Sequence, residues 1–130
     1  MTRHSGRPLL FVAEDDPAIR RILKVVLHHE QFDVVFVNDG ETLLSDVAAR
    51  APDGILLDWM LPGMEGPDVC RRLKADPLTA AIPVVFLSAR SQTREVDQGL
   101  ALGAAGYITK PFDALTIGRD IRMLLAKASG

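Results

Sequence analysis

Residues 55–66 have the sequence ILLDWMLPGMEG, in which three consecutive apolar residues lead directly to an aspartate. An apolar run without polar alternation is typical of a strand that is covered on both faces, as in the centre of a parallel sheet. Asp58 stands where this strand ends, and Pro62 and Gly63 then turn the chain. Open α/β sheets place their ligand chemistry at the carboxyl ends of strands. The stretch alone leaves two interpretations of Asp58 open, a functional carboxylate or an ordinary turn residue.

Apolar runs and helical patterns alternate along the rest of the chain. Strands are predicted at 9–13, 32–37, 55–57, 83–87 and 106–109, and helices at 17–27, 41–50, 68–75, 92–102 and 113–127. Helical spacing places Ile22 and Leu23 on the buried face of the first helix, and Val96 and Leu100 on that of the fourth. Strands that alternate with helices require a parallel sheet with right-handed crossovers. The sequence therefore predicts an α/β protein with five βα units, in which helices cover both faces of the sheet.

Composition limits the function classes. The 130 residues are 48% hydrophobic and 25% charged, which fits one globular domain. A net charge of −2 and a pI near 5.9 give no basic field, so we expect neither a nucleic acid nor a membrane as a direct partner. No apolar run has membrane-spanning length and no signal-peptide core is present, which predicts a cytoplasmic location. The single Cys70 excludes an internal disulfide.

Polar side chains follow four of the predicted strands. Glu14 and Asp15 follow the first, Asp58 the third, Ser88 the fourth and Lys110 the fifth. Because parallel strands end at one edge of the sheet, we expect these groups to converge. Charges about 4 Å apart interact by roughly 4 kcal/mol at an effective dielectric of 20, so the carboxylates would repel unless a cation lies between them. Oxygen ligands without His or Cys suit Mg²⁺, and a carboxylate beside Mg²⁺ is a competent nucleophile towards phosphorus.

Each of these residues also has an ordinary structural interpretation. Lys110 could pair with an acid at the surface, and Ser88 could cap the following helix. For any one of these residues, the structural interpretation is better than the functional one. For all of them together the functional interpretation is better, because otherwise four separate strand ends would hold groups suited to a metal and a phosphoryl group by chance.

Four segments resemble the motifs of a response-regulator receiver domain. They are VAEDDP at 12–17, LD at 57–58 with LPGM at 61–64, LSA at 87–89 and GYITKPF at 106–112. The resemblance covers roughly residues 9–126. It implies a single flavodoxin-like domain with five parallel strands in the order 2-1-3-4-5.

The resemblance also implies a phosphorylation and metal site. Asp58 would accept a phosphoryl group from a histidine kinase or a histidine phosphotransfer protein. Glu14, Asp15, Asp58 and the backbone carbonyl of Met60 would hold Mg²⁺, with Mn²⁺ as an alternative ion. Glu14 stands where the family more often has Asp, and its longer arm favours contact with the metal through water.

Further roles follow from the same resemblance. Ser88, the backbone of Ala89, and Lys110 would bind the phosphoryl oxygens, and Ser88 and Tyr107 would form the switch pair. Ser88 replaces the commoner Thr and so lacks one methyl group. The Lys110–Pro111 peptide bond is expected to be cis, whereas only about 5–6% of X–Pro bonds in folded proteins are.

Met60 and Arg90 lie two positions after Asp58 and Ser88. By the same resemblance they flank the entrance to the phosphoryl group, where they would tune dephosphorylation. A thioether accepts hydrogen bonds weakly and a guanidinium cannot act as a base, so we expect a long-lived phosphoryl group. The alternative is that both side chains point into solvent without effect.

The sequence thus predicts a phosphoacceptor switch rather than an enzyme in the ordinary sense, although it would catalyse its own phosphorylation and slow dephosphorylation. Its face made by residues 92–102, 106–109 and 113–127 would control an unknown downstream protein. We expect a monomer or a weak, phosphorylation-dependent dimer. The chain ends soon after the last predicted helix, so we expect one receiver domain over 1–130 without an output domain, and favour a stand-alone regulator over part of a longer protein.

Two other functions are alternatives for a chain of this pattern. An aspartate-nucleophile phosphatase of α/β fold needs a second acid two residues after its nucleophile, and Met60 occupies that position. A receiver-like binding module that is not phosphorylated would not need Asp58, Ser88 and Lys110 together, and all three are present.

Overall fold

The structure is a computed structural model that describes residues 6–89 and 93–129. Five strands alternate with five helices along these residues. In chain order they are β1 (Leu9–Ala13), α1 (Pro17–His29), β2 (Asp33–Val37), α2 (Gly40–Arg50), β3 (Gly54–Asp58), α3 (Gly66–Ala75), β4 (Val84–Ser88), α4 (Thr93–Ala101), β5 (Gly106–Thr109) and α5 (Ile117–Ser129).

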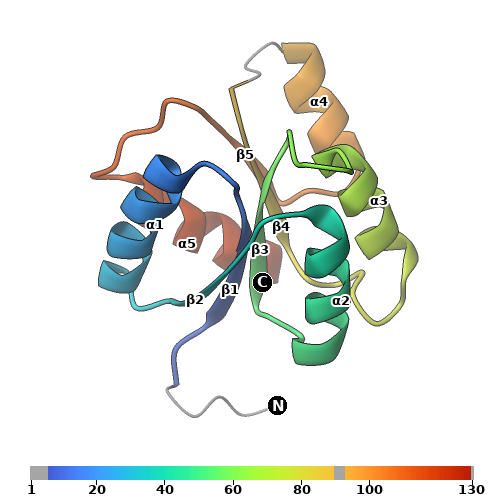
Figure 1. Ribbon diagram of the computed structural model, residues 1–130, viewed down its shortest axis with the longest axis horizontal. Coiled ribbons are helices and arrows are strands. Elements are labelled where there is room, and N and C mark those ends of the chain that lie inside the picture. The colour runs from blue at the N-terminus through green and yellow to red at the C-terminus, as the bar shows by residue number, and fades with distance from the viewer. Residues whose placement is uncertain (1–5, 90–92, 130) are drawn as a thin grey trace.

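The strands form one parallel sheet in the order β2-β1-β3-β4-β5. Figure 1 shows α1 and α5 on one face of this sheet and α2, α3 and α4 on the other. Both the predicted strand order and the placement of helices on two faces are confirmed. The loops that follow β1, β3, β4 and β5 leave the sheet at a common edge, at the top of Figure 1.

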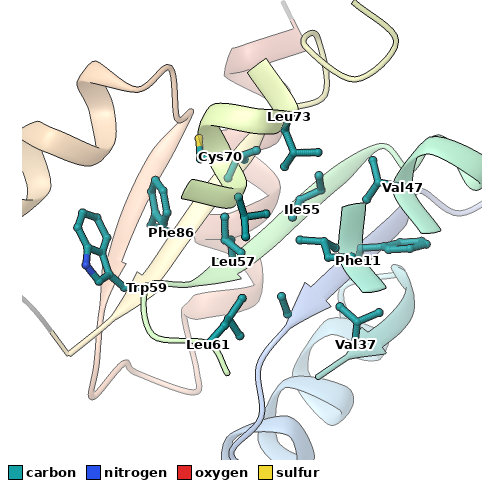
Figure 2. Packing of buried hydrophobic residues seen from close by; sticks show 14 of the residues in the cluster. Phe11, Val37, Val47, Ile55, Leu57, Trp59, Leu61, Cys70, Leu73 and Phe86 are labelled. Carbon is teal, nitrogen blue, oxygen red and sulfur yellow. The ribbon is translucent and has the colours of Figure 1, made fainter. Parts of the chain in front are cut away.

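The core consists of two apolar clusters, one on each side of the sheet. Alternate residues of β1 face opposite sides, so that Phe11 packs in the cluster below α2 and α3, whereas Leu10 and Val12 pack in the cluster below α1 and α5. Figure 2 shows part of the first cluster. Every residue of β1, β3 and β4 is buried, which explains why their sequences lack polar alternation.

The α1 helix begins where the sequence provides a cap. The carboxylate of Asp16 accepts hydrogen bonds from the backbone N–H groups of Ala18 and Ile19, and Pro17 occupies the first helical position. This helix therefore starts immediately after the loop that follows β1, which keeps Glu14 and Asp15 close to the sheet edge.

Predicted features of α4 and α5 are wrong. The last helix begins at Ile117 rather than at residue 113, because the carboxylate and carbonyl of Asp113 accept hydrogen bonds from Leu115 and Thr116 and form a turn instead. In α4, Leu100 is 45% exposed and Gly99 faces the core. Leu100 was expected inside because helical spacing alone does not fix how a helix is rotated about its axis.

The α1 helix also differs from its predicted packing, and the difference gives a stability test. Leu23 is fully buried, whereas Ile22, one residue away, is 42% exposed. We expect Leu23→Ala to lower the free energy of unfolding by about 2–5 kcal/mol, because it leaves a cavity in a packed core. The control Ile22→Ala should cost less than about 1 kcal/mol. Urea denaturation of both variants measures this, and equal losses would contradict the packing described.

No helix within residues 6–89 and 93–129 combines the length and the apolar character needed to cross a membrane.

Candidate functional site

The ammonium group of Lys110 lies between two carboxylates at the carboxyl edge of the sheet. Its Nζ is 2.8 Å from Glu14 Oε1 and 3.2 Å from Asp58 Oδ2. The Lys110 backbone N–H donates to the Ser88 carbonyl at 2.7 Å, and the Lys110–Pro111 peptide bond is cis. These contacts join the ends of β1, β3 and β5 through one side chain.

Glu14 is buried at the end of β1, with 1% of its side chain exposed. Its backbone N–H donates to Val37 at 3.3 Å, and its Oε2 accepts the N–H of Asp16 at 3.0 Å. Oε1 faces Lys110 Nζ at ion-pair distance, but among residues 6–89 and 93–129 no donor is aligned with it for a directed hydrogen bond. Burial raises the pKa of Glu14, although Lys110 acts in the opposite direction.

Carboxylate oxygens of Glu14, Asp15 and Asp58 lie within 4.8 Å of one another. Glu14 and Asp58 are buried and Asp15 is exposed. Two anions at that separation repel by about 3 kcal/mol at an effective dielectric of 20, and a single ammonium cannot offset three carboxylates. The cluster contains only hard oxygen ligands, and Glu14 Oε1 is a buried oxygen that receives no directed hydrogen bond from the part of the chain that the structure describes. This arrangement fits a hard divalent cation.

Lys110 remains positively charged in this setting. Burial by itself would lower its pKa, but the close contact with Glu14 and the charges of Asp58 and Glu14 outweigh burial and raise the pKa. The ammonium is therefore a fixed positive charge beside Asp58 at any physiological pH.

The loop that follows Asp58 is held from both sides. Asp58 Oδ1 accepts the backbone N–H of Met60 at 3.2 Å. The Trp59 N–H donates to the Leu87 carbonyl at 3.2 Å, and the Trp59 carbonyl accepts the N–H of Gly66 at 2.8 Å. The carboxylate of Asp58 is thus positioned by β4 on one side and by the start of α3 on the other.

The remaining predicted residues occupy different environments. Ser88 is buried at the end of β4, next to Leu87, which pairs in register with Asp58. Ala89 is exposed, and Met60 is 54% exposed. Tyr107 is partly buried and packs with the core cluster on the α3 and α4 side. Arg90 lies outside the described residues.

Sequence reasoning missed two features of this region. It gave Gly66 no role, although a Cβ there would lie 2.5 Å from the Asp58 carbonyl oxygen. It gave Trp59 no role, although the indole packs on Phe86 and Tyr107. The period-2 alternation of strands could have placed Leu57, Trp59 and Phe86 on one face, but the aromatic contacts depend on the tertiary structure.

Comparison with known proteins identifies the family. The sequence model described as the response regulator receiver domain matches residues 10–122. The chain is 40% identical over 121 residues to the DNA-binding response regulator MtrA of Mycolicibacterium smegmatis, covering 93% of this chain and 52% of that protein. It is 36% identical to the phosphate regulon transcriptional regulatory protein PhoB of Rhizobium meliloti, covering 93% of this chain and 53% of that protein.

A solved structure agrees with these relatives. The receiver domain of the Francisella response regulator 1452 matches with a TM-score of 0.85 at 28% identity, covering 93% of this chain and 98% of that chain. The present chain spans about half the length of the curated relatives MtrA and PhoB.

The relatives also correct the expected set of partners. Net charge predicted that nucleic acid plays no direct part, but MtrA is named as a DNA-binding regulator. That prediction was wrong. The net charge of a sequence that matches only about half of MtrA does not describe the rest of such a regulator.

The matched sequence model and the shared fold lead to the same conclusion: the chain belongs to the response regulator receiver domain family.

Proposed function

We propose that this chain is a phosphoacceptor switch in which Asp58 receives a phosphoryl group from the phosphohistidine of a histidine kinase or a histidine phosphotransfer protein. The observation that supports this most is the position of Lys110 Nζ, 3.2 Å from Asp58 Oδ2 and 2.8 Å from Glu14 Oε1. A cation held beside a buried carboxylate at the open edge of a sheet is suited to phosphoryl oxygens.

In the transfer, a carboxylate oxygen of Asp58 attacks phosphorus. A new O–P bond forms, the P–N bond to the donor imidazole breaks, and the imidazole nitrogen takes up a proton. Lys110 then pairs with a phosphoryl oxygen, and the Ser88 hydroxyl and the Ala89 N–H donate to the others. These groups stabilise negative charge that increases on the phosphoryl oxygens during the reaction.

Glu14, Asp15, Asp58 and the Met60 carbonyl would hold Mg²⁺, or Mn²⁺ in its place. When bound, the ion offsets the negative charge of the carboxylates and of the phosphoryl group. The three carboxylates already lie within 4.8 Å of one another, which supports this ligand set.

The proposal is tested by exposing the chain to acetyl phosphate with Mg²⁺ and measuring the intact mass. Here the P–O bond of acetyl phosphate breaks and acetate leaves. A switch gains one phosphoryl group, whereas an aspartate-nucleophile phosphatase turns the reagent over without accumulating phosphoprotein. A binding module that is not phosphorylated does neither, and that result would overturn the proposal.

The output that we propose follows the names of the relatives. Phosphorylation would change the face made by α4, β5 and α5, and this change would control DNA binding by an attached or associated protein, as the name of MtrA suggests for that regulator. We place the chain in the cytoplasm, which is supported by its single cysteine, Cys70, buried as a free thiol.

We expect Mg²⁺ to change the fluorescence of Trp59. This is the only tryptophan of the chain, it adjoins Asp58, and its side chain is buried. Titration of the wild type should give a saturable response. The response should disappear in a Glu14→Gln/Asp15→Asn variant, because both replacements remove a ligand charge. A response that survives in this variant would place the ion elsewhere.

We expect Met60→Asn to shorten the lifetime of phospho-Asp58. Met60 is 54% exposed beside Asp58, so its thioether excludes water without positioning it. An amide at this position can hold a water molecule for attack on phosphorus. We expect hydrolysis to be about tenfold faster, which is less than the roughly 10²–10⁴-fold rate increase that a positioned general base gives. The control is Met123→Asn, a methionine on α5 that is also more than half exposed. If both variants lose the phosphoryl group at equal rates, Met60 does not set the lifetime of phospho-Asp58.

A further inference from the structure

Three aromatic rings meet on the side of the sheet that α4 covers. Ring centroids are 5.1 Å apart for Trp59 and Phe86, 5.7 Å for Trp59 and Tyr107, and 6.0 Å for Phe86 and Tyr107. Figure 2 shows the Trp59 indole beside Phe86 at the margin of the core. Trp59 directly follows β3, Phe86 lies in β4 and Tyr107 lies in β5, and each of these strands leads to a group of the proposed site.

The connection is closest for Trp59, which directly follows Asp58. Its backbone N–H is bonded to Leu87 and its carbonyl to Gly66, and 4% of the residue is exposed. A buried indole on such a fixed backbone cannot change position independently of the segment that holds the Asp58 carboxylate.

The other side of the ring cluster is in contact with α4. A Cβ on Gly99 would lie 3.1 Å from Phe86 Cδ2 and 3.2 Å from Tyr107 Cδ2. The backbone of α4 therefore rests on these two rings without an intervening side chain. A movement of either ring towards α4 therefore acts directly on the backbone of the helix.

We infer that Trp59 is a positioning residue that transmits the state of Asp58 to Tyr107 and α4. This inference rests on the proposed phosphorylation of Asp58, and it adds to the switch a second route beside the Ser88 hydroxyl. Phosphorylation draws the Asp58 segment towards the new contacts of the phosphoryl group, the indole moves with it, and Tyr107 repacks between Trp59 and Gly99. Packed rings repack between discrete arrangements, so a small displacement at Asp58 changes the position of α4.

The experiment uses the whole chain, phosphorylated with acetyl phosphate and Mg²⁺. Intact mass gives the extent of phosphorylation, and ¹H–¹⁵N spectra give the amide shift changes of α4. Trp59→Leu removes the indole, Trp59→Phe keeps an aromatic ring, and Leu73→Ala is the control. Leu73 is buried in the same cluster but is not one of the three rings.

We expect Trp59→Leu to be phosphorylated like the wild type, while the shift changes of α4 fall by about half or more. Trp59→Phe should restore most of the response. Leu73→Ala should keep the full response although it weakens the core, so that loss of stability alone does not explain the result. A full α4 response in phosphorylated Trp59→Leu would overturn the inference, as would failure of that variant to accept phosphate.

Gly99→Ala tests the same inference from the side of α4, and it serves if Trp59→Leu does not fold. It adds a methyl group against Phe86 and Tyr107 from the opposite side, and should alter the α4 response of the phosphorylated protein. An unchanged response would overturn the inference. If the wild type itself gains no phosphoryl group, the proposed function fails instead, and the mass spectrum distinguishes the two failures.

Discussion

Asp58→Asn abolishes phosphorylation by acetyl phosphate while the chain stays folded: this is the expected result for the nucleophile of the proposed reaction. The amide keeps the shape of the side chain, and its oxygen can still accept the hydrogen bond that Met60 donates to Asp58 Oδ1 at 3.2 Å. The nucleophilic carboxylate is lost, so no acyl phosphate can form. Lys110 keeps its ion pair with Glu14.

The same substitution has a matched control in Asp68→Asn. Asp68 is an exposed residue of α3 whose carboxylate pairs with Arg71, 2.5 Å away. We expect Asp68→Asn to be phosphorylated like the wild type, and we expect both variants to unfold cooperatively in urea. Intact mass after incubation with Mg²⁺ and acetyl phosphate measures the difference. If Asp58→Asn gains a phosphoryl group at the full rate, Asp58 is not the residue that accepts it.

Most of the fold could be predicted because its sequence patterns are local. The apolar run at Ile55 to Leu57 is unbroken because β3 is covered on both faces, and the same holds for β1 and β4. The position of Asp58 at a strand end followed from the same pattern. The convergence of Glu14, Asp58 and Lys110 followed from topology, since parallel strands end at one edge.

What could not be predicted depends on contacts between distant residues. Helical spacing could not decide whether Gly99 or Leu100 of α4 faces the core, because the answer depends on rings that leave no room for a side chain. The contact of Lys110 with Glu14, shorter than its contact with Asp58, depends on side-chain conformations. The start of α5 depends on Asp113, whose short polar side chain stabilises a turn as readily as a helix end.

Gly66→Ala should have the largest effect on stability of any single methyl addition near the site. A Cβ at Gly66 would lie 2.5 Å from the Asp58 carbonyl oxygen and 2.9 Å from Trp59 Cα. Both are backbone atoms, and the Gly66 N–H is bonded to the Trp59 carbonyl, so neither segment can yield without breaking that contact. Overpacking typically costs about 1–3 kcal/mol, and we expect the upper end of this range because backbone must move.

Gly40→Ala provides the comparison that isolates this effect. Gly40 is also buried and is also the first residue of its helix, but its Cβ would meet side-chain atoms, with Val69 Cγ2 nearest at 2.6 Å. Side chains can shift without displacing a strand end, so we expect Gly40→Ala to cost about 1–2 kcal/mol. The two variants should differ further in function, since only Gly66→Ala displaces the segment that holds Asp58 and should slow its phosphorylation by acetyl phosphate. Urea denaturation and the phosphorylation rate test both expectations, and equal behaviour of the variants would show that the start of α3 does not position the carboxylate.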